Sequence, residues 1–149
     1  MQLFIVIFSS ISILLSQDLF FSEYLEGSNY NKAIEIYNGT GSAVDLSQYT
    51  IKQSHNGSGW GINGDGGSGN DGMHYELNLS GYTLEYGDVF IIADDRAAAE
   101  IKYFADLILS YGKGDGSKIQ AFTGDDAMGL FNNGTLIDVI GTEDEPSSN

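Results

Sequence analysis

The sequence predicts an all-β fold, an antiparallel β-sandwich with one short helix, from three observations. Ile34 and Ile36 alternate with smaller or more polar neighbours, as in a strand with one face in a core and the other in water. Residues 88–93 form an almost continuous apolar run, which is typical of a strand covered on both faces. Asn133 and Gly134 separate two strand-like segments, and both central positions of a type I′ hairpin turn need positive φ. Short strands separated by Gly-rich turns favour a sandwich.

The other elements follow from the same patterns. Residues 19–37 hold two strand-like runs around a polar, Gly-containing loop, and this β pair opens the folded region. In residues 96–109 apolar side chains recur at helical spacing after Asp94 and Asp95, either of which can cap a helix, so the single helix is predicted there. Residues 55–72 and 112–116 are rich in Gly and are predicted to be loops. Further strands are predicted at 49–53, 74–79, 119–122 and 127–131.

Both ends of the chain differ in composition from its centre. Residues 1–17 carry no charged side chain and have an apolar core that is too short to span a bilayer. We interpret them as a signal peptide, although the basic n-region is missing; a buried first strand is the alternative. The folded domain then covers 18–141, and the acidic, polar residues 142–149 are predicted to be a disordered tail. The protein is accordingly expected to be secreted or held at a cell surface, without a stable membrane anchor.

The charge of the chain narrows the range of partners. The formal net charge is −15, from 21 acidic and 6 basic residues. The basic residues are scattered singly, so no Lys/Arg stripe is available to neutralise phosphates, and no nucleic acid is expected to bind this domain. The chain has no cysteine, so an exported domain would depend on core packing, a bound ion or partners rather than on disulfides. An acidic surface attracts divalent cations, and it is also an ordinary means of solubility.

Three blocks of the sequence are similar to successive parts of a known family. The blocks are LFFSEYLEGSNYNKAIEIYNGTGSAVDLSQYTI at 19–51, LSGYTLEYGDVFIIAD at 79–94 and FTGDDAMGLFNNGTLIDVIG at 122–141. In order and spacing they resemble the lamin tail domain family, in its bacterial exported type. The resemblance implies an immunoglobulin-like sandwich. The chain departs from the family pattern by a Gly/Asp-rich insertion at 57–72 and by the lack of a closing strand after Gly141, which would leave an unpaired sheet edge.

The resemblance also implies a type of function. Lamin tail domains are non-enzymatic interaction modules, and any chemistry in the proteins that carry them belongs to neighbouring domains. We therefore expect a non-enzymatic binding or spacer module of a secreted or cell-surface protein of a bacterium, with a protein or a surface glycan as partner. One alternative is an N-terminal accessory fragment of a larger extracellular hydrolase, such as a nuclease. A second alternative is a calcium-stabilised adhesion module.

Two groups of carboxylates are candidates for Ca²⁺. Residues 66–74 fit the calcium-binding nonapeptide pattern once, and Asp65 and Asp71 with backbone carbonyls could supply oxygen ligands. Such sites normally need stacked copies, so one copy is a weak signal. Asp125 and Asp126 are the other candidate pair, but we favour a structural role for them, in which they accept backbone N–H bonds at the turn before the last hairpin.

No catalytic residue is predicted. His55 and His74 flank the Gly-rich insertion, but they lack the H-E-x-x-H or His-x-Glu spacing of a catalytic zinc site and are expected to be solvated loop residues. No serine lies in a G-x-S-x-G elbow, and no cysteine nucleophile exists. No cofactor is expected apart from the Ca²⁺ considered above.

Trp60 is the one candidate binding residue. It lies in a loop that otherwise contains little apolar surface, so it could be exposed and stack on a sugar or anchor a partner. An equally weighted alternative is that Trp60 fixes its loop to the sandwich.

Overall fold

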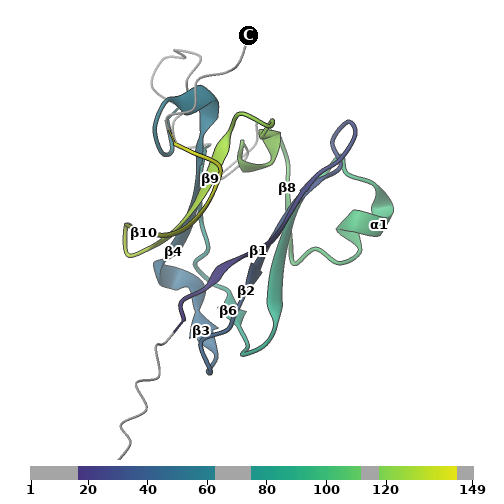
Figure 1. Ribbon diagram of the computed structural model, residues 1–149. Coiled ribbons are helices and arrows are strands. Elements are labelled where there is room, and N and C mark those ends of the chain that lie inside the picture. The colour runs from purple at the N-terminus through teal and green to yellow at the C-terminus, as the bar shows by residue number, and fades with distance from the viewer. Residues whose placement is uncertain (1–16, 63–74, 112–117, 144–149) are drawn as a thin grey trace, which may run out of the picture.

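Two four-stranded sheets pack face to face in this protein, and Figure 1 shows them on the two sides of the molecule. The computed structural model describes residues 17–62, 75–111 and 118–143. The first sheet contains, in spatial order, β1 (Phe20–Glu26), β2 (Lys32–Tyr37), β7 (Val89–Asp94) and β8 (Leu107–Leu109). The second sheet contains β10 (Thr135–Ile140), β9 (Ala127–Asn132), β4 (Tyr49–Ser54) and β5 (Glu76–Asn78).

Shorter elements connect the two sheets. A two-stranded pair joins β3 (Val44–Asp45) to β6 (Thr83–Leu84). The helical elements that lie wholly within the described residues are the 3₁₀ turns η1 (Leu46–Gln48), η2 (His55–Gly57) and η4 (Ile119–Ala121) and the α-helix α1 (Ala99–Lys102). The prediction of an all-β sandwich with one short helix is confirmed for the residues that the structure describes.

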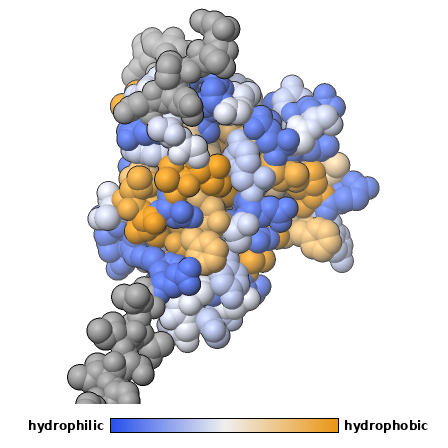
Figure 2. Space-filling model, viewed as in Figure 1, coloured by the Kyte–Doolittle hydropathy of each residue, from blue (hydrophilic) through white to orange (hydrophobic). Residues whose placement is uncertain are grey.

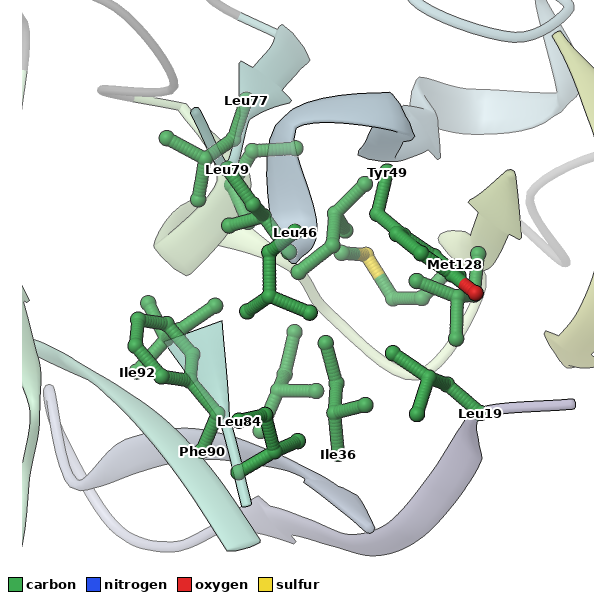
Figure 3. Close-up of a cluster of buried hydrophobic side chains, with 14 of the residues drawn as sticks. Leu19, Ile36, Leu46, Tyr49, Leu77, Leu79, Leu84, Phe90, Ile92 and Met128 are labelled. Atoms are coloured by element: carbon green, nitrogen blue, oxygen red, sulfur yellow. The ribbon is translucent and has the colours of Figure 1, made fainter. Parts of the chain in front are cut away.

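The core lies between the sheets and consists of the inward-facing residues of both. Ile34 and Ile36 of β2 and Ile92 of β7 are fully buried, and they face Ile51 of β4 and Leu130 of β9 from the second sheet. Figure 3 shows how side chains such as Leu46, Leu84 and Phe90 converge in this layer. Each such side chain contributes about 1.5–3 kcal/mol of burial free energy, so core packing is a main source of stability in a chain that has no cysteine and therefore no disulfide.

The last hairpin forms as predicted. β9 and β10 pair antiparallel, with Asn132 opposite Thr135. Asn133 and Gly134 between them have φ values of 49° and 77°. Positive φ at both central positions is what a type I′ turn requires, and Asn and Gly are the residues that adopt it at least cost.

The helix predicted at 96–109 is wrong in its extent. Only α1 is α-helical, and the chain then continues into β8, which pairs parallel to β7. The backbone N–H of Asp106 donates to the carbonyl of Ile91 at 2.9 Å, and the Asp106 carboxylate accepts the N–H of Ile91 at 2.8 Å. These two bonds satisfy the backbone carbonyl and the backbone N–H of Ile91 in β7. Phe104 and Ile108, which gave the helical periodicity, are 67% and 46% exposed, so a continued helix would have had little to pack against.

The strand predicted at 119–122 is also wrong, because residues 119–121 form η4 and Phe122 directly follows this turn. Ile119 and Phe122 are both fully buried. Residues three apart lie on the same side of a 3₁₀ turn, whereas in a strand they would lie on opposite faces. The turn therefore allows both side chains to enter the core.

A carboxylate links the two sheets where their edge strands meet. β1 has an extra residue at Ser22 and β10 has one at Ile137, so each strand contains a bulge. Next to them, the backbone N–H of Phe21 donates to the Asp138 carboxylate at 2.7 Å. In the described chain β10 is an edge strand, as expected, and its Leu136 and Val139 are 41% and 43% exposed.

Residues near the ends of the described chain contact the sandwich. The carbonyl of Glu143 accepts a hydrogen bond from the Ser54 hydroxyl at 2.7 Å, so the predicted tail is held at its first residues. The rest of the predicted tail and nearly all of the predicted signal peptide lie outside the described residues. Within the described part of the chain, no helix is long and apolar enough to cross a membrane.

Candidate functional site

An apolar groove with a volume of about 460 Å³ lies on the outer face of the first sheet. Side chains alternate along a strand, so residues whose neighbours fill the core point outward here. The sheet contributes Leu25 from β1, Ala33 from β2 and Ile91 from β7. The other wall comes from Ile101 in α1 and from Phe104, which follows it. Figure 2 shows hydrophobic surface beside α1.

Carboxylates surround this apolar groove. Glu23 and Glu35 lie on the sheet side and Glu100 on the helix side, and none of the described residues that line the groove is basic. Glu35 accepts a hydrogen bond from the Ser22 hydroxyl at 2.7 Å, which fixes one carboxylate at the rim. The groove therefore combines an apolar floor with a negative rim, and this combination favours ligands that are apolar and positively charged.

Asp126, one of the predicted calcium ligands, is part of a buried hydrogen-bond network. Its Oδ1 accepts the N–H of Asn56 at 2.9 Å and lies 3.1 Å from Nδ1 of His55. Its Oδ2 accepts the N–H of Thr123 at 2.7 Å. Asp125 binds only locally, by accepting the Thr123 hydroxyl at 2.7 Å. Both carboxylates thus organise the turn before β9, in agreement with the structural role favoured from the sequence.

His55 differs from its expected state. We expected a solvated loop histidine, but its side chain is only 17% exposed and its ring stacks on Tyr75 with centroids 5.1 Å apart. The His55–Asp126 contact resembles the base and orienting pair of a hydrolase. The nearby Ser54 hydroxyl, however, donates to the Glu143 carbonyl rather than to the histidine. The pair therefore joins two turns and presents no nucleophile among the described residues.

The calcium prediction remains open. Asp65, Asp71 and His74 lie outside the described residues. In the described ranges, no three or more His, Asp or Glu side chains are grouped so that they could hold a metal ion. Calcium binding by Asp65, Asp71, Asp125 and Asp126 stays a prediction.

Trp60 lies on the second sheet. Its ring meets Phe131 edge to face, with centroids 5.6 Å apart. Gly129 is opposite: a Cβ there would lie 3.0 Å from Cζ3 of Trp60. The ring therefore packs on β9 and is partly buried, which favours the anchoring role; the binding role of Trp60 stays a prediction.

A comparison with protein families complements this geometry. A model of the Lamin Tail Domain family matches residues 15–144. The chain belongs to the lamin tail domain family. The comparison with curated proteins finds no relative that matches. Lamin tail domains are immunoglobulin-like structural and interaction domains, a class that is not typically catalytic.

The groove of this lamin tail domain was missed from the sequence. Its residues come from three strands and from α1 with the segment that follows it. On the strands, the apolar residues that face the groove alternate with apolar residues that face the core, and the sequence pattern does not distinguish the two faces. The signal that the sequence did offer was the apolar and aromatic composition of residues 101–104, which include Ile101, Tyr103 and Phe104. Tyr103 is 83% exposed, and clustered apolar side chains on an exposed surface often mark an interaction site.

Proposed function

We propose that this lamin tail domain is a non-enzymatic, exported binding module, and that its acidic-rimmed apolar groove is the interaction surface. The partner would be a protein segment that presents apolar side chains next to Lys or Arg. The observation that carries the proposal is the groove itself, with Phe104 and Ile101 facing a sheet surface that is bordered by Glu23, Glu35 and Glu100.

The energetics support a binding role for this surface. Phe104 is 67% exposed, so a partner could remove much of its apolar surface from water. Burial of one such aromatic side chain contributes about 1.5–3 kcal/mol, and a few central side chains usually supply most of the affinity of an interface. The carboxylates at the rim, within a chain of net charge −15, would accelerate association with a basic partner.

The groove is tested with a short amphipathic peptide of Lys and Leu, titrated into the full chain by fluorescence anisotropy. The same peptide with Glu in place of Lys should bind about tenfold more weakly or worse, because it faces the carboxylates of the rim. Phe104→Ser should weaken binding of the Lys peptide by about tenfold. The matched control is Tyr86→Ser, which removes an aromatic ring that is 60% exposed and does not line the groove.

Two outcomes would refute the proposal. Equal affinity for the Lys and Glu peptides would show that the acidic rim does not discriminate between basic and acidic peptides. Equal losses in Phe104→Ser and Tyr86→Ser would show that the peptide adheres to exposed aromatic rings in general.

Export is tested separately by the N-terminal sequence of the secreted protein. Expression of the full chain in a bacterial host should yield extracytoplasmic protein that begins at or near Asp18, after removal of residues 1–17. Protein that retains Met1 and stays in the cytoplasm would refute export and would leave the groove proposal unaffected.

A further inference from the structure

A second cavity, of about 400 Å³, differs from the groove in chemistry. It lies among the loop between β1 and β2, the segments after β7 and β8, and η4. It shares no lining residue with the groove. No acidic side chain is among the described residues that line it, although the chain has 21 acidic residues.

Positive charge collects around this cavity. Lys32 and Arg96 line it, and Nζ of Lys118 lies 4.2 Å from the ring centroid of Tyr111, another lining residue. These are three of the six basic residues in the sequence. Glu26 lies 3.6 Å from Lys32 and Asp95 lies 3.8 Å from Nε of Arg96, so these two charges are partly balanced.

Arg96 is held in a fixed position. Its Nε and Nη2 donate to the two oxygens of the buried Asp94 at 2.8 and 2.6 Å. Its guanidinium lies 3.7 Å from the ring centroid of Tyr30 and 4.7 Å from that of Tyr111. Burial acts to raise the pKa of Asp94, but the hydrogen bonds and charge of Arg96 outweigh it and lower that pKa below its ordinary value. The remaining guanidinium nitrogen, Nη1, makes no bond to Asp94 and can donate to a ligand.

Gln120 adds an acceptor that no protein group satisfies. It lines the cavity and is 2% exposed. Its Nε2 donates to the carbonyl of Ile92 at 3.3 Å, which fixes the orientation of the amide. Its Oε1 is buried and accepts no hydrogen bond. Buried acceptors are nearly always paired, so this atom points to a ligand that carries a hydroxyl or N–H donor.

We propose that this cavity binds one uronic-acid-type sugar unit, a hydroxylated ring that carries a single carboxylate. The carboxylate would be paired with the cations, a hydroxyl would donate to Oε1 of Gln120, and the ring would lie against Tyr111. A long polyanion fits less well, because the acidic surface repels it. A peptide with a free C-terminus also fits less well, because Ala121 is the one aliphatic residue of the lining and offers no pocket for a side chain.

The test is an NMR titration of the ¹⁵N-labelled full chain with glucuronate at physiological salt. A ligand of this size should bind with a Kd on the order of 1 mM. The shifts should include the side-chain amide of Gln120. Glucose, which lacks the carboxylate, and acetate, which lacks the hydroxyl groups, should each bind about tenfold more weakly.

Two variants assign the binding to this cavity. Gln120→Met keeps the side-chain size and removes the acceptor, so it should weaken glucuronate binding by about tenfold. Tyr111→Ala should weaken it similarly, because the ring that flanks Arg96 is lost. Tyr86→Ala is the matched control, since Tyr86 is 60% exposed and does not line the cavity.

Several results would overturn the proposal. Acetate binding as tightly as glucuronate would indicate an adventitious ion only. Glucose binding as tightly as glucuronate would remove the role of the carboxylate, and tighter binding of a short peptide with a free C-terminus would indicate a peptide site. Unchanged affinity in Tyr111→Ala, or no shift with glucuronate at about twenty times the expected Kd, would also overturn it.

Discussion

Gly129→Ala tests whether the ring of Trp60 packs on β9 of the sandwich. Gly129 lies in β9, and a Cβ added there would be 2.8 Å from Cε2 of Phe131, 3.0 Å from Cδ1 of Leu136 and 3.0 Å from Cζ3 of Trp60. Ordinary carbon contacts are about 3.5–4.0 Å, so all three side chains must move. Overpacking of this kind costs about 1–3 kcal/mol. Because the three atoms are ends of side chains rather than backbone, we expect a loss of about 2 kcal/mol in the free energy of unfolding.

A double-mutant cycle isolates the contribution of Trp60. Trp60→Ala removes one of the three close contacts, so Gly129→Ala should cost about 0.5–1 kcal/mol less in that background than in the wild type. The penalty should not vanish, because Phe131 and Leu136 remain. The assay is urea unfolding of the full chain followed by far-UV circular dichroism. Trp60 is the only tryptophan, so its fluorescence in Gly129→Ala reports directly on movement of the ring.

Gly124→Ala is the matched control for this cycle. No atom lies within 4 Å of a Cβ at Gly124, and its φ is not positive. We expect no loss, or a gain of about 0.4–1 kcal/mol from reduced freedom of the unfolded chain. If Gly129→Ala costs the same with and without Trp60, the ring does not rest on β9. Trp60 would then be available to a partner, as the alternative interpretation of the sequence holds.

Three further changes test the fold, each by urea unfolding. Asn38→Leu should lose about 3 kcal/mol, because the buried amide donates to the carbonyls of Ser42 and Leu84; a loss below about 1 kcal/mol would refute this role. Asp94→Asn should lose about 2 kcal/mol at pH 7, since it unpairs the partly exposed Arg96. The folded pKa of Asp94 is lowered, so its stabilisation is present above the unfolded pKa and disappears as pH falls through the folded value. The difference in the free energy of unfolding between the wild type and Asp94→Asn should therefore narrow below about pH 4. A difference that does not change with pH would contradict a lowered pKa of Asp94. Gly134→Ala should lose about 1–2 kcal/mol, because φ is 77° there, and an unchanged midpoint would argue against the strained turn.

Local patterns were sufficient to predict the strands and the last hairpin. The alternation around Ile34 and Ile36 predicts a strand whichever strand it pairs with, and here it pairs with β7. Asn133-Gly134 predicts its turn because these two residues adopt positive φ at low steric cost. The lamin tail resemblance also rested on these segments. The structure of these segments depends on residues that are close in the sequence. They could therefore be predicted without knowledge of the strands with which they pair.

The elements that were wrong depend on distant partners. Residues 101–108 have helical spacing, but β8 forms because Asp106 pairs with Ile91 in β7. Residues 119–122 look extended, but the core accepts Ile119 and Phe122 from the same side. In both segments tertiary packing overrides local preference.

The two cavities could not be predicted for a related reason. Tyr30, Arg96 and Tyr111 are far apart in the sequence and belong to three different connections. No spacing rule relates them, so neither the stacking on Arg96 nor the unsatisfied acceptor of Gln120 could be seen before the fold was known. Trp60 could be singled out by its unusual loop, but its contact with Gly129 could not.

The link between Phe21 and Asp138 has a mechanical consequence. In the described chain β1 is hydrogen-bonded as a strand only to β2, and β10 only to β9, so side chains rather than a ladder of backbone bonds join the start of the first sheet to the second. Besides Asp138, the carboxylate of Asp18 accepts bonds from Tyr49 and Asn132 at this point. Under tension applied through β1 and β10, these few side-chain bonds would carry the load first. The domain would therefore yield at a lower force than a sandwich whose first and last strands share a backbone ladder.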